Sequence, residues 1–83
     1  MMVGIDVAVQ LLYVTFDYDL PEYVENATII VTTIKGDMVQ QFGLEESKNQ
    51  ILWDTRTIKD GIYFYALKQG KHTLASGKVS IMK

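Results

Sequence analysis

Apolar and polar residues alternate along much of this chain, and short polar segments interrupt the alternation several times. The longest alternating stretch lies within Val7 to Leu20, where apolar positions from Leu12 onward alternate with Tyr13, Thr15, Asp17 and Asp19. A period of two predicts a strand with one apolar face and one polar face. Pro21 lacks a backbone N–H and fixes its own φ, so the strand is expected to end there. Glu22 to Asn26 should then connect it to the next strand.

A hairpin is predicted in the middle of the chain. Ala27 to Ile34 is rich in β-branched residues and is too apolar for a strand with one wet face. Lys35 to Asp37 supply turn residues, and Met38 to Phe42 should form the returning strand. The window that follows, Gly43 to Asn49, is the most polar of the chain and is predicted to be a loop.

The last third of the chain predicts further strands around a tight turn. Trp53 to Thr55 close a short apolar strand, and a polar stretch then leads to Gly61. Gly61 to Leu67 combines aromatic and branched side chains, which predicts a central strand buried on both faces. Gln69 to Lys71 should form a turn, and Lys78 to Lys83 alternates again. The sequence given is therefore predicted to finish on a strand.

These segments together predict the fold class. No stretch of helical length carries apolar residues at i, i+3, i+4 and i+7. The chain is therefore predicted to be all-β, an antiparallel β-sandwich of about six to seven strands. Its 83 residues should form one domain, 1–83, with no linker or internal repeat. A domain of this size buries only about 60 to 65% of its unfolded surface, so modest stability is expected.

Composition and charge argue against several classes of function. A net charge of −2 and a pI near 5.1 give no basic surface for nucleic acid. The absence of cysteine rules out a disulfide and a thiolate metal site. No apolar stretch approaches the roughly 20 residues of a membrane-spanning helix. The opening residues lack a basic region and Asp6 interrupts their apolar run, so no signal peptide is expected in this chain.

Few residues could support chemistry. His72 is the only histidine, so neither a histidine cluster nor a serine–histidine–aspartate set with alternative bases can form. Asp17 and Asp19 share the polar face of one strand and could bind a hard cation if a loop added oxygen ligands, although a solvated strand face is expected. Glu45 and Glu46 fall in the predicted loop and are expected to be solubilising charge. No catalytic residue, metal ligand or cofactor is assigned, and enzymatic activity is not expected.

The aromatic residues allow two interpretations. Trp53, Tyr63 and Tyr65 could line a platform that stacks against sugars or bases. A sandwich this small needs its largest side chains as core, however, so these three are expected to be buried. Tyr13 and Tyr23 are better candidates for exposure.

Several short motifs occur here in the order in which a known family has them. They are Trp53 to Thr55, then G-I-Y-F-Y-x-L at Gly61 to Leu67, then S-G-K-V-x-I-x-K at Ser76 to Lys83. This order resembles the type A C-terminal sorting domain of cargo proteins of the Bacteroidetes type IX secretion system. Further matching segments lie upstream, so that the resemblance covers roughly Phe16 to Lys83: Tyr18 to Pro21, Asn26 to Ile29 and Ile34 to Val39.

The resemblance implies a fold, a role and a set of positions. It implies an immunoglobulin-like sandwich of about seven strands that an outer-membrane translocon recognises and a surface sortase later removes. The domain would not be catalytic, and it would belong to a larger cargo protein that is secreted or held at the cell surface. The positions that match the sorting motifs are Gly36, Gly61, Tyr63, Leu67, Gly77, Lys78, Val79, Ile81 and Lys83.

Two other functions are compatible with the same sequence. One is an adhesion or carbohydrate-binding sandwich whose ligand site lies on loops or exposed tyrosines, and the other is an accessory domain that supports a neighbouring catalytic domain.

The edges of the predicted sheets suggest that the domain also associates with itself. Met1 to Gln10 is apolar with only Asp6 to discourage edge pairing, which predicts a homodimer formed through strand edges.

Overall fold

The structure is a computed structural model that describes residues 3–21 and 24–83. These residues form seven strands, and no helix occurs among them. The strands are β1 (Gly4–Val9), β2 (Tyr13–Asp19), β3 (Ala27–Thr33), β4 (Met38–Gly43), β5 (Lys48–Asp54), β6 (Gly61–Gln69) and β7 (His72–Ile81).

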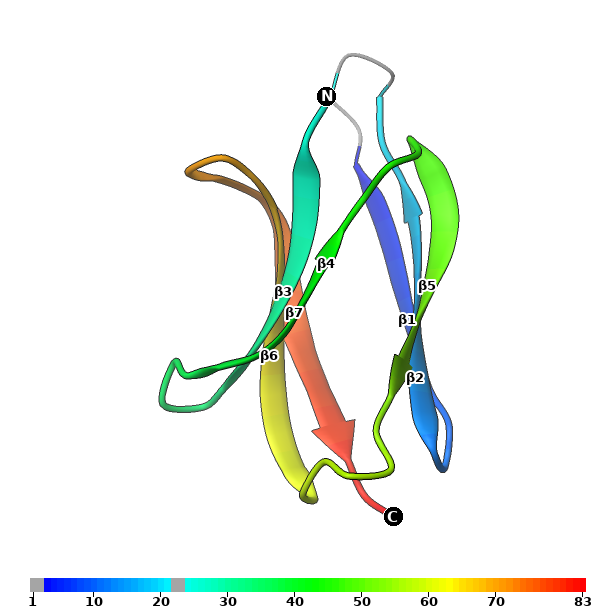
Figure 1. The fold of residues 1–83 in the computed structure, drawn as a ribbon, viewed down its shortest axis with the longest axis vertical. Helices are drawn as coiled ribbons and strands as arrows, with labels where there is room; N and C mark the ends of the chain where they lie inside the picture. Colours follow the sequence, from blue (N-terminus) through cyan, green and yellow to red (C-terminus); the bar gives the residue numbers. More distant parts are fainter. Residues whose placement is uncertain (1–2, 22–23) are drawn as a thin grey trace.

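The strands form two antiparallel sheets that face each other (Figure 1). One sheet has three strands in the order β1-β2-β5, and the other has four in the order β4-β3-β6-β7. The chain changes sheet after β2, after β4 and after β5, which is the connection pattern of immunoglobulin-like sandwiches. The predicted all-β antiparallel sandwich is confirmed. Figure 1 also shows that β1 begins near one end of the long axis and β7 finishes near the other.

The core lies between the sheets and is built from every second residue of the inner strands. Val14 and Phe16 of β2, Ile29 and Val31 of β3, and Leu67 of β6 are all fully buried. Alternation along a strand turns these residues to one face, and their branched or aromatic side chains suit the pleated surface. The residues at the alternate positions turn to the outer faces: Asp17 is exposed there and Ile30 is half-buried, whereas Thr15 is largely covered, at 8% exposed.

Aromatic side chains join the two sheets. Trp53 of β5 meets Tyr63 of β6 edge to face, with 6.0 Å between the ring centroids. The ring of Phe16 in β2 lies 5.6 Å from that of Tyr65 in β6. Trp53 and Tyr63 are buried, at 2% and 8% exposed, which confirms their assignment to the core, whereas Tyr65 is only partly buried against it.

The prediction of one long strand from Val7 to Leu20 is wrong. Strand β1 ends at Val9 and β2 begins at Tyr13, with a tight turn between them. The N–H of Gln10 donates to the carbonyl of Tyr13 at 2.8 Å, which closes the turn. Leu11 and Leu12 occupy this turn exposed to solvent, so the apolar character of the segment conceals the turn in the sequence.

The predicted loop from Gly43 to Asn49 is shorter than expected. Strand β4 includes Gly43 and β5 already begins at Lys48, so only residues 44–47 connect the two sheets here. Leu44 is buried and its N–H donates to the carbonyl of Ala27 at 2.9 Å, which fixes the connection against β3. Of the predicted connection from Glu22 to Asn26, Glu22 and Tyr23 lie outside the described residues.

Two predictions about the C-terminal strands need correction. Strand β6 is central in its sheet, but it is buried on one face only, because Ile62 and Phe64 of the other face are 47% and 41% exposed. No third layer covers that face among the residues that the structure describes. The last strand begins at His72, six residues before the predicted start at Lys78, because small and polar residues extend its pairing with β6.

Candidate functional site

The residues that match the sorting motifs gather on the hairpin of β6 and β7, apart from Gly36 in the turn between β3 and β4. Among the strands that the structure describes, β7 is an edge strand and pairs with β6 alone. The register places Tyr63 opposite Val79, Phe64 opposite Lys78, and Gly61 opposite Ile81. The structure therefore brings eight of the nine positions into one hairpin or directly next to it, at the edge of the four-stranded sheet.

Four of these positions face the core. Tyr63, Leu67, Val79 and Ile81 are each at most 8% exposed. The Tyr63 hydroxyl donates to the carbonyl of Lys59 at 2.6 Å, so its one polar atom is satisfied inside the protein. A partner that binds the folded domain could not touch these four side chains, and their role is to hold the hairpin against the other sheet.

Two glycines of the motif are required by the backbone. Gly36 has a φ of 95° in the turn between β3 and β4, and Gly61 has a φ of 153° at the start of β6. Side chains with a Cβ rarely adopt such angles, so each glycine allows a change of chain direction that another residue would strain. Both glycines are therefore explained by the backbone conformation and not by a contact with a ligand.

Gly77 is explained by a side chain on the neighbouring strand. A Cβ atom built at Gly77 would lie 2.5 Å from the Tyr65 hydroxyl oxygen and 2.7 Å from two atoms of its ring. Tyr65 is the cross-strand partner of Gly77, so the ring lies over the glycine and takes the place of its missing side chain. Such cover by an aromatic ring stabilises glycine in an edge strand.

Lys83 follows β7 and holds the connection between β5 and β6. Its ammonium donates to the carbonyls of Thr55 at 2.9 Å, of Arg56 at 3.3 Å and of Ile58. Its backbone N–H donates to a carboxylate oxygen of Asp60 at 3.2 Å. One lysine thus satisfies three carbonyls that no strand pairs, and the end of β7 is fixed to a loop more than twenty residues earlier in the chain.

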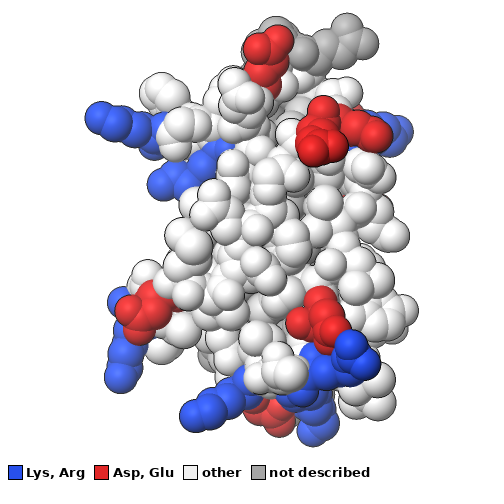
Figure 2. Space-filling view, viewed as in Figure 1, with Lys and Arg blue, Asp and Glu red and all other residues white. Residues whose placement is uncertain are grey.

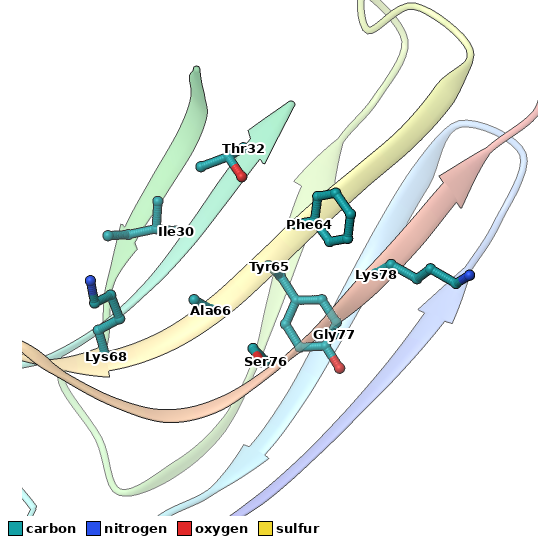
Figure 3. Close-up of a pocket in the computed structure, with 9 residues that line it drawn as sticks. All are labelled: Ile30, Thr32, Phe64, Tyr65, Ala66, Lys68, Ser76, Gly77 and Lys78. Atoms are coloured by element: carbon teal, nitrogen blue, oxygen red, sulfur yellow. The ribbon is translucent and has the colours of Figure 1, made fainter. Parts of the chain in front are cut away.

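Lys78 is the only motif residue whose side chain is left to solvent without such a role. It is exposed on the outer face of the sheet, beside Phe64, and none of the hydrogen bonds or ion pairs within residues 3–21 and 24–83 involves its ammonium. Both side chains border a shallow groove of about 530 Å³ on that face, shown in Figure 3. The groove was not expected from the sequence, because an aromatic run such as that around Phe64 indicates burial. No sequence signal separates Phe64 from its inward neighbours, because Ile62 to Tyr65 is aromatic or branched at every position.

The remaining candidate residues do not form a site. His72 is exposed at the start of β7. Asp17 accepts a hydrogen bond from Gln50 at 3.3 Å, and Asp19 lies 4.0 Å from the ammonium of Lys48. No group of three or more His, Cys, Asp or Glu residues that could hold a metal ion occurs among the residues described.

The acidic residues of the connection between β4 and β5 are exposed and have an electrostatic effect on one buried side chain. Glu45 and Glu46 lie on the surface beside Tyr18 of β2. Burial raises the pKa of the Tyr18 hydroxyl, and the negative charges of Glu46 and Glu45 raise it further, although a backbone hydrogen bond from Glu46 opposes them. Of the two tyrosines expected to be exposed, Tyr13 is 39% exposed, whereas Tyr23 lies outside the described residues.

The surface charges are mixed. Figure 2 shows that Lys, Arg, Asp and Glu side chains gather toward the periphery of one face and leave its centre uncharged. The closest ion pair joins Arg56 to Asp54 at 2.6 Å, and the hydrogen bonds from Arg56 lower the pKa of the Asp54 carboxyl to about 2. Among the residues described, charges of both signs are therefore mixed on this face, and no cluster of one sign there would attract a polyanion.

Comparison with known proteins identifies the family. Residues 8–82 match the family described as "Secretion system C-terminal sorting domain", which is the sorting domain of type IX secretion. No curated protein matches the chain, and no solved structure matches it. Within the described part of the chain, no helix is long and apolar enough to cross a membrane. Because the family match covers nearly the whole sequence, the chain belongs to the family of type IX secretion C-terminal sorting domains.

Proposed function

We propose that this domain is a non-catalytic signal that directs a cargo protein across the outer membrane to the cell surface through the type IX secretion system. Membership of the family supports a sorting role for type IX secretion. The proposal adds that the outer-membrane translocon binds the folded domain at its β6–β7 hairpin, and that a surface sortase then removes the domain from the cargo.

The position of β7 is the observation that supports this recognition best. One side of β7 pairs with β6, and no strand described in the structure pairs with the other side. An edge strand offers backbone donors and acceptors to which a receptor can add a strand of its own. The buried motif residues Val79 and Ile81 hold β7 in place, while Lys78 points outward beside the edge. The buried motif residues thus fix the edge strand, and Lys78 is exposed beside it.

A transfer experiment tests the proposed function. The domain is fused behind a fluorescent reporter that carries a periplasmic export signal, and the fusion is expressed in a bacterium with a type IX system. We expect the reporter at the cell surface or in the medium, and we expect it in the periplasm when the domain is omitted. In a strain that lacks the translocon, the complete fusion should also stay in the periplasm.

The size of the exported reporter tests the sortase step separately. If the sortase removes the domain, the exported reporter should be smaller than the periplasmic fusion by the mass of the domain. In a strain without the sortase, the fusion should stay intact. Retention of the complete fusion in the periplasm, under conditions in which another member of the family exports the same reporter, would contradict the proposed function.

A further inference from the structure

The outer face of the four-stranded sheet carries an apolar groove with a lysine at each end. The groove is lined by Ile30 of β3, by Phe64 and Ala66 of β6, and by Ser76 of β7. Figure 3 shows Lys68 and Lys78 at opposite ends of this group of side chains. We call this surface the outer-face groove.

Charge is distributed unequally between the two outer faces of the sandwich. The lining of the outer-face groove includes two lysines and no carboxylate, although the chain as a whole has a net charge of −2. The outer face of the β1-β2-β5 sheet instead carries three carboxylates and one lysine around a second hollow: Asp6, Asp17, Asp19 and Lys48. The excess of negative charge therefore avoids the outer-face groove.

The two lysines have no partner within the described residues. Neither ammonium takes part in a hydrogen bond or an ion pair there. Between the lysines, Phe64 lies in the middle of the sheet and is 41% exposed. On the solvated face of an antiparallel sheet, side chains are commonly polar. An exposed apolar surface bordered by polar groups is typical of a site for a protein partner.

We propose that the outer-face groove is a docking surface for an acidic protein surface, with an apolar side chain of the partner over Phe64 and Ala66 and carboxylates on Lys68 and Lys78. The proposal rests on the proposed function and assigns the partner to the secretion machinery. Lys68 follows Phe64 by four positions and Phe64 pairs with Lys78, so strand geometry places the two lysine backbones about 14 Å apart. The carboxylates of the partner must span a similar distance.

The number of lysines favours a protein over a membrane. Binding to anionic lipid is typical of clusters of about four to eight basic residues, and the groove has two. Two charges on either side of an apolar centre instead define a position and an orientation, which is what recognition of a protein surface requires. A second copy of this chain could offer the acidic face around Asp17, and that pairing is an outcome of the test below.

Charge reversal within the reporter fusion tests the proposal. The double variant Lys68→Glu/Lys78→Glu should reduce the exported fraction at least about tenfold. The matched control Lys35→Glu/Lys71→Glu makes the same change of net charge in two turns and should stay within about twofold of the unmodified fusion. Lys68→Arg/Lys78→Arg keeps both positive charges and should restore most of the export that Lys68→Glu/Lys78→Glu loses. A cooperative urea unfolding transition of each purified domain establishes that the variant is folded.

The outcomes are distinguishable. Retention of the unmodified fusion in the periplasm would contradict the proposed function and the docking surface together. Export of the unmodified fusion with equal export of Lys68→Glu/Lys78→Glu would overturn the docking surface alone. If this variant does not fold, Lys78→Gln and Phe64→Ser decide, since each changes one exposed side chain: reduced export by both supports the proposal, and unchanged export by either overturns it.

Two measurements on the purified domain address the other occupants of the groove. Vesicles that contain phosphatidylglycerol should not bind the domain, and binding that Lys68→Glu/Lys78→Glu abolishes would assign the groove to a membrane. Sedimentation should show no association that depends on the two lysines. A dimer that the same variant dissociates would assign the groove to a second copy. Either result would overturn the proposal.

Discussion

Strand β6 has two different faces, and its consecutive residues Tyr63 and Phe64 illustrate the difference. Tyr63 points inward, packs edge to face on Trp53 and is 8% exposed. Phe64 points outward, borders the groove between Lys68 and Lys78, and is 41% exposed. The two side chains are similar in size but differ in their surroundings. The buried Tyr63 therefore serves stability, whereas the exposed Phe64 is free to serve recognition. The comparison suggests that most of the sorting motif specifies the fold and that a smaller, outward part is available to a partner.

The largest expected effect is the loss of the inward side chain. Tyr63→Ala should lower the free energy of unfolding by about 3 to 5 kcal/mol, because it removes a buried ring and leaves a cavity. Phe64→Ala should cost about 1 kcal/mol, since much of its ring is already in water. Urea denaturation of both variants measures the difference. Equal losses would mean that the two faces of β6 are not distinct.

The cover of Gly77 by Tyr65 gives a second, smaller effect at the edge strand. Gly77→Ala should cost about 1 to 3 kcal/mol, because the added Cβ collides with the ring of Tyr65. In a Tyr65→Ala background the collision is absent, so the same substitution should cost much less. A double-mutant cycle by denaturation measures this coupling. Independent, additive effects would show that the ring does not lie over the glycine.

A matched pair of lysines tests the end of β7. Lys83→Met keeps the aliphatic stem but loses the bonds to three carbonyls, and it should cost about 1 kcal/mol at this partly exposed site. Amide exchange within Thr55 to Asp60 should become faster as the loop loosens. Lys78→Met should leave both quantities unchanged, because its ammonium has no partner within the described residues. A reversed order of the two effects would be inconsistent with the structure.

The smallest expected effect is electrostatic and lies at the surface. The pKa of Asp54 is lowered from 3.8 to about 2 by Arg56, so the stabilising effect of the carboxylate is complete above pH 3.8 and is lost as the pH falls through about 2. Arg56→Ala should return this pKa toward its ordinary value. A titration of the Asp54 carboxyl carbon followed by NMR measures both values. A midpoint near 3.8 in the unmodified protein would exclude the ion pair in solution.

The inward face of the hairpin was predictable from sequence, whereas its outward face was not. Tyr63, Val79 and Ile81 are apolar residues at alternating positions, and a small sandwich has no other place for them. For Phe64 the same chemistry predicts burial, because a sequence does not reveal that the sheet has no covering layer on that side. Its exposure depends on the arrangement of the sheets and not on the residue.

Turns and long-range contacts account for the other differences. Leu11 and Leu12 carry no turn signal, so the boundary between β1 and β2 depends on pairing within the sheet. The contact of Lys83 with Thr55 joins residues 28 positions apart, and it requires the finished fold to bring the end of β7 to the β5–β6 loop. Family resemblance named Lys83 as a motif position, and its contacts with the β5–β6 loop are visible only in the structure.

The most direct test of the difference between the inward and outward faces of β6 is to repack the buried side of the hairpin and measure export. The variant Tyr63→Phe/Val79→Ile changes two buried motif residues conservatively and leaves Phe64, Lys68 and Lys78 unchanged. Provided that urea denaturation shows a folded domain, the reporter should be exported within about twofold of the unmodified fusion. A folded variant whose export falls about tenfold or more would contradict the account, because the machinery would then depend on the identity of side chains that the folded domain buries.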